Sequence, residues 1–338
     1  MKKSYGLVLS LLLASIIFAE KVMTFPEKMR PFFIKVDDSQ MYITDGPTIS
    51  IYSLSDYKLL KQFGREGEGP GEFKIPGRTG GSVAIFITRD NIVVNSIGKI
   101  SYFTKHGEYI GEIPTRSVST RFLPLGEQQF VGEAFTQEND KNYSTRNIYN
   151  DKFEKRKELY RRMSFYQPEW GGDLNPFHAI SPVTHIYDKK IFIGSETDEI
   201  YVFNENGEKI NSIKIGLEKL PVNENYKKGF LDFYKTNIHL KQFYELVKNR
   251  LKFPKYFPAI RLYDVVDDKI YVLTYKKQGE KSEFLIYDIK GKFLKKIMVP
   301  LAERDELLWS PYTIKNGKLY QLIENKKMTW ELHVTEIK

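Results

Sequence analysis

The chain of 338 residues is 41% hydrophobic and 14% aromatic, which is enough for one large all-β domain or two ordinary domains with a real core. It contains no cysteine, so disulfides, thiolate metal sites and a cysteine nucleophile are excluded. The 52 basic and 43 acidic side chains give a net charge of +9. A solvated basic surface explains this charge most simply, and attraction to an anionic envelope is the alternative.

The first 19 residues have the pattern of an export signal. Lys2 and Lys3 form its positive end, an apolar run extends from Leu7 to Phe18, and Ala19 is a small residue for cleavage. The run is short for a membrane span, and no cysteine follows it to carry a lipid anchor. We therefore predict a cleaved signal at 1–19, a mature chain at 20–338 without a membrane span, and a periplasmic or secreted location. We expect a monomer that does not bind nucleic acid.

A hairpin pattern recurs five times along the chain. Each copy is an apolar strand that ends in aromatic residues, a tight polar turn and a second strand, and the copies lie at 49–60, 100–112, 148–160, 200–213 and 284–297. Three turns carry glycine at the same place, at Gly107, Gly207 and Gly291. Glycine there supplies the positive φ that a tight hairpin needs. A recurring hairpin indicates a repeat architecture.

A further short strand precedes each hairpin and allows the repeats to be counted. Six such strands are centred on Tyr42, Val93, Phe130, Phe192, Tyr271 and Tyr320, with gaps of 51, 37, 62, 79 and 49 residues. The two longest gaps contain insertions, a Pro/Gly/aromatic loop at 162–179 and a helical stretch at about 217–257. Without them the spacing approaches the roughly 40–50 residues of a four-stranded blade. The sequence therefore predicts an all-β, six-bladed β-propeller; a β-solenoid has a shorter repeat and fits less well.

The two ends of the chain predict how the ring closes. The last unit is one strand short, and Lys21 to Phe25 form a strand before the first unit without a partner of its own. Pairing this strand as the outer strand of the last blade closes the ring and protects an exposed edge.

The insertion between the fourth and fifth units is predicted to be helical. Its apolar residues recur at spacings of three and four or their sums, with Lys and Asn between them, which is typical of one amphipathic helix or two short ones. Pro254 and Pro258 end it. The apolar residues are Phe230, Phe233, Tyr234, Ile238, Val247 and Leu251.

The segment Phe63 to Phe73 carries a family resemblance. Its sequence, FGREGEGPGEF, resembles the F-G-x-x-G-x-G-P-G-E-F signature of NHL-type repeats in exported bacterial six-bladed propellers, and Phe253 to Ile260 also look like that group. The resemblance covers the mature chain and implies the fold. It says very little about function, because propellers host many different activities. No Lys-Ser/Thr pair or helix follows the glycines, so phosphate-loop chemistry is not supported.

Catalytic motifs are absent from the sequence. The five histidines lack metal-ligand spacing on one element, and only His178 and His185 flank an inner strand where they could approach the channel. Metal-dependent propeller hydrolases need oxygen ligands on several inner strands. The residues predicted near the starts of the inner strands include no carboxylate; they are Phe32, Val83, Thr120, Pro182, Arg261 and Ser310. We therefore predict no metal and no cofactor.

What remains is a candidate binding surface. The Gly-rich loop and both insertions lie in connections between blades, so topology places them on one face at the channel mouth. Aromatic residues beside arginines suit a sugar, a peptide or an acidic ligand. The candidate ligand-binding residues are Arg65, Arg121, Tyr166, Trp170, Asp173, His178 and Arg261.

Two classes of function stay open. The favoured one is a non-catalytic binding or scaffold propeller that recognises an unknown protein, peptide, glycan or acidic ligand at the channel-mouth face. The alternative is a lyase or hydrolase with its site at the channel mouth. A metal ion in the channel would favour the enzyme, and a groove with aromatic and arginine side chains would favour the binding protein.

Overall fold

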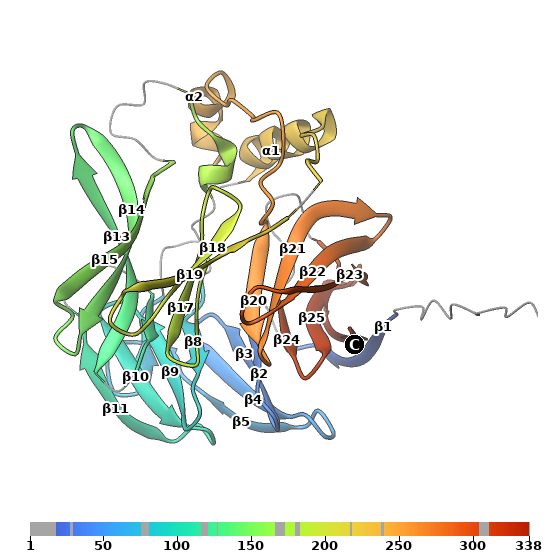
Figure 1. Cartoon of the computed structure of the whole chain (residues 1–338). Coiled ribbons are helices and arrows are strands. Elements are labelled where there is room, and N and C mark those ends of the chain that lie inside the picture. Colours follow the sequence, from blue (N-terminus) through green and yellow to red (C-terminus); the bar gives the residue numbers. More distant parts are fainter. Residues whose placement is uncertain are drawn as a thin grey trace, which may run out of the picture.

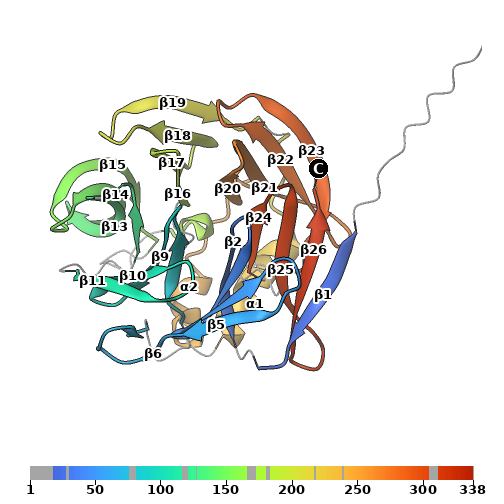
Figure 2. The ribbon, with the colours of Figure 1, turned by 90° about the horizontal axis from the view of Figure 1, so that it is seen from below.

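Six four-stranded antiparallel sheets surround a central axis in the computed structural model of this protein (Figures 1 and 2). The structure describes residues 18–27, 30–75, 81–115, 121–126, 128–165, 173–179, 183–216, 218–237, 240–303 and 311–337. The predicted six-bladed propeller is confirmed. The predicted signal residues 1–17 lie outside the described part.

Each of the first five blades is built from four consecutive strands, the first of which is innermost. Blade 1 has β2 (Pro31–Val36), β3 (Gln40–Asp45), β4 (Thr48–Ser53) and β5 (Leu59–Phe63), and blade 2 has β8 (Ala84–Ile87), β9 (Asn91–Ser96), β10 (Lys99–Thr104) and β11 (Tyr109–Pro114). Blade 3 has β12 (Phe122–Pro124), β13 (Gln129–Glu138), β14 (Lys141–Asn150) and β15 (Lys155–Met163). Blade 4 has β16 (Thr184–Tyr187), β17 (Lys190–Gly194), β18 (Glu199–Phe203) and β19 (Lys209–Lys214). Blade 5 has β20 (Leu262–Val266), β21 (Lys269–Gln278), β22 (Lys281–Asp288) and β23 (Phe293–Pro300).

The sixth blade closes the ring with a strand from the other end of the chain. It consists of β24 (Tyr312–Lys315), β25 (Lys318–Glu324), β26 (Trp330–Glu336) and β1 (Ala19–Phe25), in the order β1-β26-β25-β24. β1 pairs with β26 antiparallel from Ala19 opposite Thr335 to Phe25 opposite Trp330. The predicted closure by the N-terminal strand is confirmed. Phe25 anchors it, since this ring is 1% exposed and packs edge-on against Tyr52 of blade 1, with 5.2 Å between ring centroids.

Apolar clusters between neighbouring blades form the core. Strand side chains alternate between the two faces of a sheet, so each blade presents one apolar face to the blade before it and one to the blade after it. Between blades 3 and 4, for example, Val131 and Ile148 pack against Ile191, Ile193 and Phe203. Because every face needs a neighbouring blade, the last blade must meet the first.

The repeated hairpins share a turn with one residue of positive φ. In blade 4 this residue is Gly207, with φ of +72°, and a Cβ there would lie 2.8 Å from the Leu159 side chain of blade 3. Glycine is therefore needed both for the backbone conformation and for close contact between blades. The outer strand that follows carries a β-bulge in blades 1 to 5, which disrupts its pairing edge.

The two long insertions pack against each other on one face of the propeller, which we call the insert face (Figure 1). The helical insertion between blades 4 and 5 contains α1 (Glu224–Thr236), the 3-10 turn η2 (Lys241–Phe243) and α2 (Tyr244–Lys248). Phe230, Tyr234 and Val247 are buried in a cluster with Phe165 and Leu174 of the 162–179 loop. The helical prediction is confirmed in outline, and Ile238 lies outside the described residues.

The helices end before the fifth blade, and the loop contributes one further short element. A backbone bridge joins Leu174 to Leu251 after α2, and a 3-10 turn, η1 (Pro176–Ala179), leads from the loop towards blade 4. No helix in the described ranges is both long and apolar enough to span a membrane.

The Gly-rich segment is a tight loop between blades 1 and 2. Its short strands β6 (Arg65–Glu66) and β7 (Glu72–Phe73) pair in parallel. The Glu72 carboxylate accepts hydrogen bonds from the Gly69 backbone N–H at 2.9 Å and from Arg65 Nε at 2.8 Å. Phe73 is fully buried between the two blades. The motif therefore positions a core side chain and closes a sharp turn.

We expect Phe25→Ala to destabilise the protein by about 3–5 kcal/mol, because it removes a buried ring from the closing strand. Urea unfolding measures the effect. Thr24→Ala is the matched control on the same strand, since Thr24 is exposed, and it should change the free energy of unfolding by less than about 0.5 kcal/mol. Equal stabilities of the two variants would contradict the role of β1 in closure.

We also expect Gly207→Ala to cost about 1–3 kcal/mol, since the new Cβ meets Leu159 and the backbone has positive φ. Gly111→Ala in β11 is the control, because a Cβ there meets no atom within 4 Å. Thermal and urea unfolding of the two variants should differ clearly. If Gly111→Ala is the more damaging change, the turn does not have the proposed importance.

Candidate functional site

A pocket of about 340 Å³ lies on the insert face over blade 4. Its lining comes from the end of blade 3, the η1 turn, blade 4, the segments on both sides of the helices α1 and α2, and the start of blade 5 with Tyr275 of β21. The lining residues used below are Arg162, Phe177, His178, Glu196, Asp198, Lys219, Tyr256, Phe257, Arg261 and Tyr275. The pocket therefore depends on both insertions.

Aromatic rings form one wall of the pocket. Phe257 stacks on Tyr275 with 4.4 Å between centroids and an interplanar angle of 17°. Phe177 of η1 meets both rings edge-on at 5.8 and 5.6 Å. Tyr226 of α1 lies behind them, 4.8 Å from Phe257. Because these rings already hold one another in place, they form a fixed apolar surface. A ligand can bind to it without the entropic cost of ordering the rings.

A charged and polar group forms the opposite wall. Arg162 of β15 lies with Nε 3.4 Å from Glu196 Oε1 and donates from its terminal nitrogen to the His178 carbonyl at 3.1 Å. His178 Nε2 lies 3.0 Å from Glu196 Oε1. Burial and then the Arg162 charge lower the pKa of His178 to about 4, so this imidazole is neutral at pH 7. Burial raises the pKa of Glu196, although Arg162 opposes this shift.

Arg261 is already occupied by an internal partner. It precedes β20, its side chain is 5% exposed, and its two terminal nitrogens contact both carboxylate oxygens of Glu303 at 2.6 and 3.2 Å. Burial alone would lower the pKa of Arg261, but the hydrogen bonds to Glu303 outweigh it and the pKa is raised. A two-point contact of this kind fixes the guanidinium in the wall of the pocket.

Lys219 provides a more exposed positive charge at the rim. Its Nζ lies 5.4 Å from the centre of the Tyr256 ring, and the residue is exposed. The nearby Asp198 carboxylate instead accepts the Ala259 backbone N–H at 2.7 Å, which ties the segment after α2 to blade 4.

The predicted candidates are only partly brought together. His178 and Arg261 line the pocket, whereas Arg65 is 81% exposed on the Gly-rich loop and contacts Glu72. Asp173 is exposed and is not among the lining residues. Arg121 reaches Phe33 of the blade 1 inner strand, with 5.4 Å from guanidinium carbon to ring centre, and so lies at the channel mouth. Tyr166 and Trp170 lie outside the described residues.

Several polar residues of the site and channel were not predicted. Arg162 lies near the end of β15 and Glu196 follows β17, but nothing in the local sequence marks the two as neighbours. The comparison of inner strands was confined to their starts and missed Asp264 within β20. Its carboxylate lies 3.9 Å from His185 Nε2 of β16, while His185 Nε2 lies 2.7 Å from the Tyr263 carbonyl. Thr120, Pro182 and Ser310 lie outside the described residues.

Among the described residues, no group of three or more His, Asp or Glu side chains is placed to hold an ion. His185 and Asp264 are a single pair, and hard cations need more oxygen ligands.

Comparisons with known proteins found no family and only distant similarity to solved structures. No protein-family model matches this chain, and no curated protein matches it. Among solved structures it is similar to BamB from Moraxella catarrhalis, with a TM-score of 0.43 and 10% identity over 94% of this chain and 100% of that one. It is also similar to the computationally designed Ika8 protein, with a TM-score of 0.39 and 9% identity over 92% of this chain and 98% of that one. Both scores are too low to inform function.

We expect the stability of the protein to rise with pH between about 4 and 6.5 partly because of His178. In that range the unfolded chain binds a proton at this residue that the folded protein, with its pKa of about 4, does not. His178→Gln should therefore flatten the dependence of urea unfolding on pH. His106→Gln is the control, because His106 is exposed in a hairpin turn. Identical pH profiles for wild type and His178→Gln would contradict the assignment.

Proposed function

We propose that this protein is an exported, non-catalytic binding propeller that holds a small acidic ligand in the pocket on the insert face. The observation that carries this proposal is the meeting of a packed aromatic wall with basic side chains in a pocket of about 340 Å³. A mainly apolar cleft with a few convergent polar groups is the usual form of a ligand site. The ligand is a small carboxylate or the acidic end of a peptide.

Charge favours an acidic ligand over a neutral sugar. Arg162, Lys219 and Arg261 line the pocket, whereas its carboxylates are Glu196 and Asp198. Asp198 is held by a backbone N–H, and the pKa of Glu196 is raised by burial. Arg261 contributes charge but is engaged with Glu303, so Lys219 at the rim is the cation we assign to direct contact with the ligand.

Export and family membership are also proposals. Cleavage after Ala19 would leave Glu20 to Phe25, and hence most of the paired register of β1, in the mature protein. The structured Gly-rich loop is compatible with the NHL-type resemblance, since its glycines and Phe73 have structural roles here.

One observation favours the alternative of a lyase or hydrolase. His178 and Glu196 are 3.0 Å apart in the pocket, and their pKa values are shifted in opposite directions from their usual values. Paired titratable groups with shifted pKa values are frequent in active sites. The ion-pair role of Glu196 beside Arg162 explains the pair without catalysis, and we therefore retain binding as the main proposal.

A calorimetric screen with small carboxylates, acidic dipeptides and neutral sugars tests the proposal. Lys219→Gln and Tyr256→Ala should each weaken binding of the best acidic ligand about tenfold, equivalent to about 1.4 kcal/mol. Lys214→Gln, which alters an exposed lysine of β19, is the control and should bind as wild type does.

The same screen can contradict the proposal in two ways. Preferential binding of neutral sugars, unaffected by Lys219→Gln, would show that the ligand class is wrong. Conversion of a bound compound to product, lost in His178→Gln, would favour the enzyme instead. Arg261→Ala is unsuitable as a test, because it leaves the buried Glu303 carboxylate without its main partner and should cost about 3–5 kcal/mol.

A further inference from the structure

The upper half of the interface between blades 3 and 4, on the side of the insert face, is charged where the lower half is apolar. Ile148 of β14 packs against blade 4, and two residues earlier Arg146 projects from the same side of the strand. Glu133 is directly opposite Arg146, and Arg162 is directly opposite Ser144. Arg121 immediately precedes β12, whose Phe122 is opposite Gly132, so the register places Arg121 beside Glu133. Three arginines of one blade therefore share one face.

Two of these arginines are buried and bonded within the protein. Arg146 is 5% exposed; its Nε donates to Thr184 Oγ1 of blade 4 at 3.1 Å, and a terminal nitrogen lies 3.1 Å from Glu133 Oε1. Arg162 is 8% exposed and contacts Glu196 and the His178 carbonyl, as described above.

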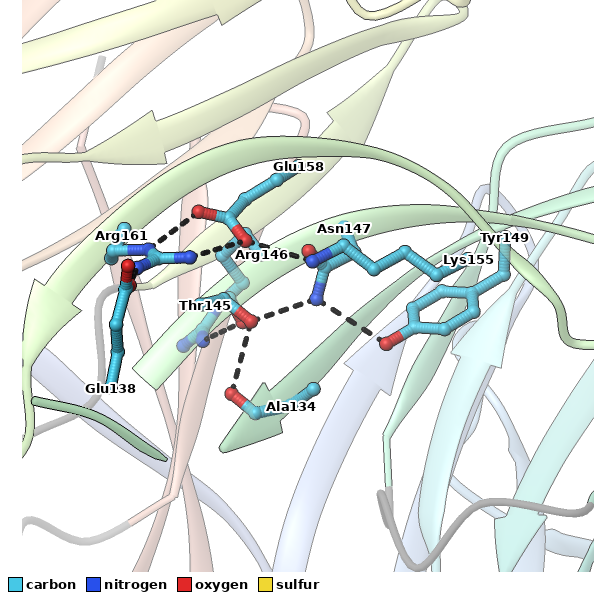
Figure 3. A network of polar contacts seen from close by, with 9 residues as sticks. All are labelled: Ala134, Glu138, Thr145, Arg146, Asn147, Tyr149, Lys155, Glu158 and Arg161. Carbon is cyan, nitrogen blue, oxygen red and sulfur yellow. Dashed lines mark hydrogen bonds and ion pairs between the residues drawn. The ribbon is translucent and has the colours of Figure 1, made fainter. Parts of the chain in front are cut away.

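The opposite face of blade 3 carries a second polar network, and Arg146 joins it by donating from a terminal nitrogen to the Thr145 carbonyl at 3.1 Å (Figure 3). There Asn147 Nδ2 donates to Thr145 Oγ1 at 2.8 Å and contacts the Tyr149 hydroxyl, while Arg161 bonds to Glu138 and Glu158. Glu138 and Glu158 are both paired with Arg161, so these two carboxylates do not balance the charge on the face towards blade 4.

Arg121 differs from the other two arginines because it is exposed. Its guanidinium lies over the Phe33 ring, and within the described ranges no carboxylate forms an ion pair with it at contact distance. Burial among surrounding protein atoms lowers its pKa, followed by an opposing effect of Glu133 and a repulsive effect of Arg146. The side chain is exposed to water, and yet surrounding protein lowers its pKa. Both observations fit a guanidinium that projects into the channel mouth, where water reaches it but protein surrounds it.

The charges on this face do not balance. Glu133 pairs with Arg146 and Glu196 with Arg162, so among the described residues three arginines meet two glutamates on this face, and Arg121 is the arginine without an ion pair. Concentrating like charges in a partly desolvated cleft is unfavourable unless an anion offsets them, and such clefts raise the local concentration of anions.

We propose that Arg121, with Arg146 and Arg162 behind it, forms a second ligand site at the channel mouth that binds an oxyanion group, a carboxylate or a phosphate. A planar guanidinium fixed over an aromatic ring suits two-point binding of either group. The site goes beyond the pocket proposed above, since neither Arg121 nor Arg146 lines that pocket.

Titration calorimetry of the full chain with inorganic phosphate and with succinate tests the proposal. Wild type should bind at least one probe saturably, and the preferred probe distinguishes phosphate from carboxylate. Arg121→Gln should weaken that binding about tenfold or more, through loss of a charged two-point contact. Arg65→Gln, which alters an exposed arginine on the Gly-rich loop, should have no effect. Glu133→Gln should strengthen binding, because it removes a negative charge that acts on Arg121 and would repel an anion.

The outcomes separate this site from the pocket. No saturable binding of either probe, or equal binding by wild type and Arg121→Gln, would overturn the proposal. Loss of binding in Lys219→Gln with full binding in Arg121→Gln would overturn it as well, while supporting the pocket. Phosphate or succinate binding that depends on Arg121 would uphold it even if the pocket takes no acidic ligand. Because Arg121 is exposed, we expect its Gln variant to retain the wild-type melting temperature, so the test does not depend on Glu133→Gln folding.

Discussion

Burial of one blade face against the next is the interaction on which this structure depends. Each sheet has two apolar faces, and strand alternation requires both to be covered, so an open row of six blades would leave two faces in water. Pairing of β1 with β26 completes the last blade with a strand from the other end of the chain, so that the ring is closed. Phe25 then packs between Tyr52 of blade 1 and Trp330 of blade 6, which links the closing strand to the core on both sides. Ring closure in turn fixes the positions of the loops that extend from the blades.

The best candidate region for function is the interface where charged side chains replace the apolar contacts between blades. The lower part of the interface between blades 3 and 4 is apolar, but its upper part contains arginines and glutamates whose burial is unfavourable without partners. The long strands β13 and β14 extend beyond the short inner strand β12, which leaves room for these side chains next to the channel. The two insertions cover the same region and supply the aromatic wall. A stable scaffold thus supports a polar region that the fold itself does not require.

The candidate site could be predicted only in part. His178 and Arg261 were found because they lie close to inner strands, whose positions follow from the repeat. Arg65 belongs to a loop with a structural role, and its pairing with Glu72 depends on the turn made by the Gly-rich segment. Arg162, Glu196 and Glu303 were missed because each becomes important through a partner far away in the sequence. Asp264 was missed because the comparison of inner strands covered only the start of each strand.

The sequence by itself determined the number of blades, the positions of their strands, the helical insertion and the closing strand. These features follow from local periodicity, turn residues and spacing, which are encoded within short segments. Only the tertiary structure decided which charges are neutralised and which face a cavity. Arg261 and Arg121 look equivalent in the sequence, yet one is buried against Glu303 and the other is exposed over the Phe33 ring. That difference arises from contacts between blades, and such contacts depend on how the sheets pack rather than on the pattern within any one of them.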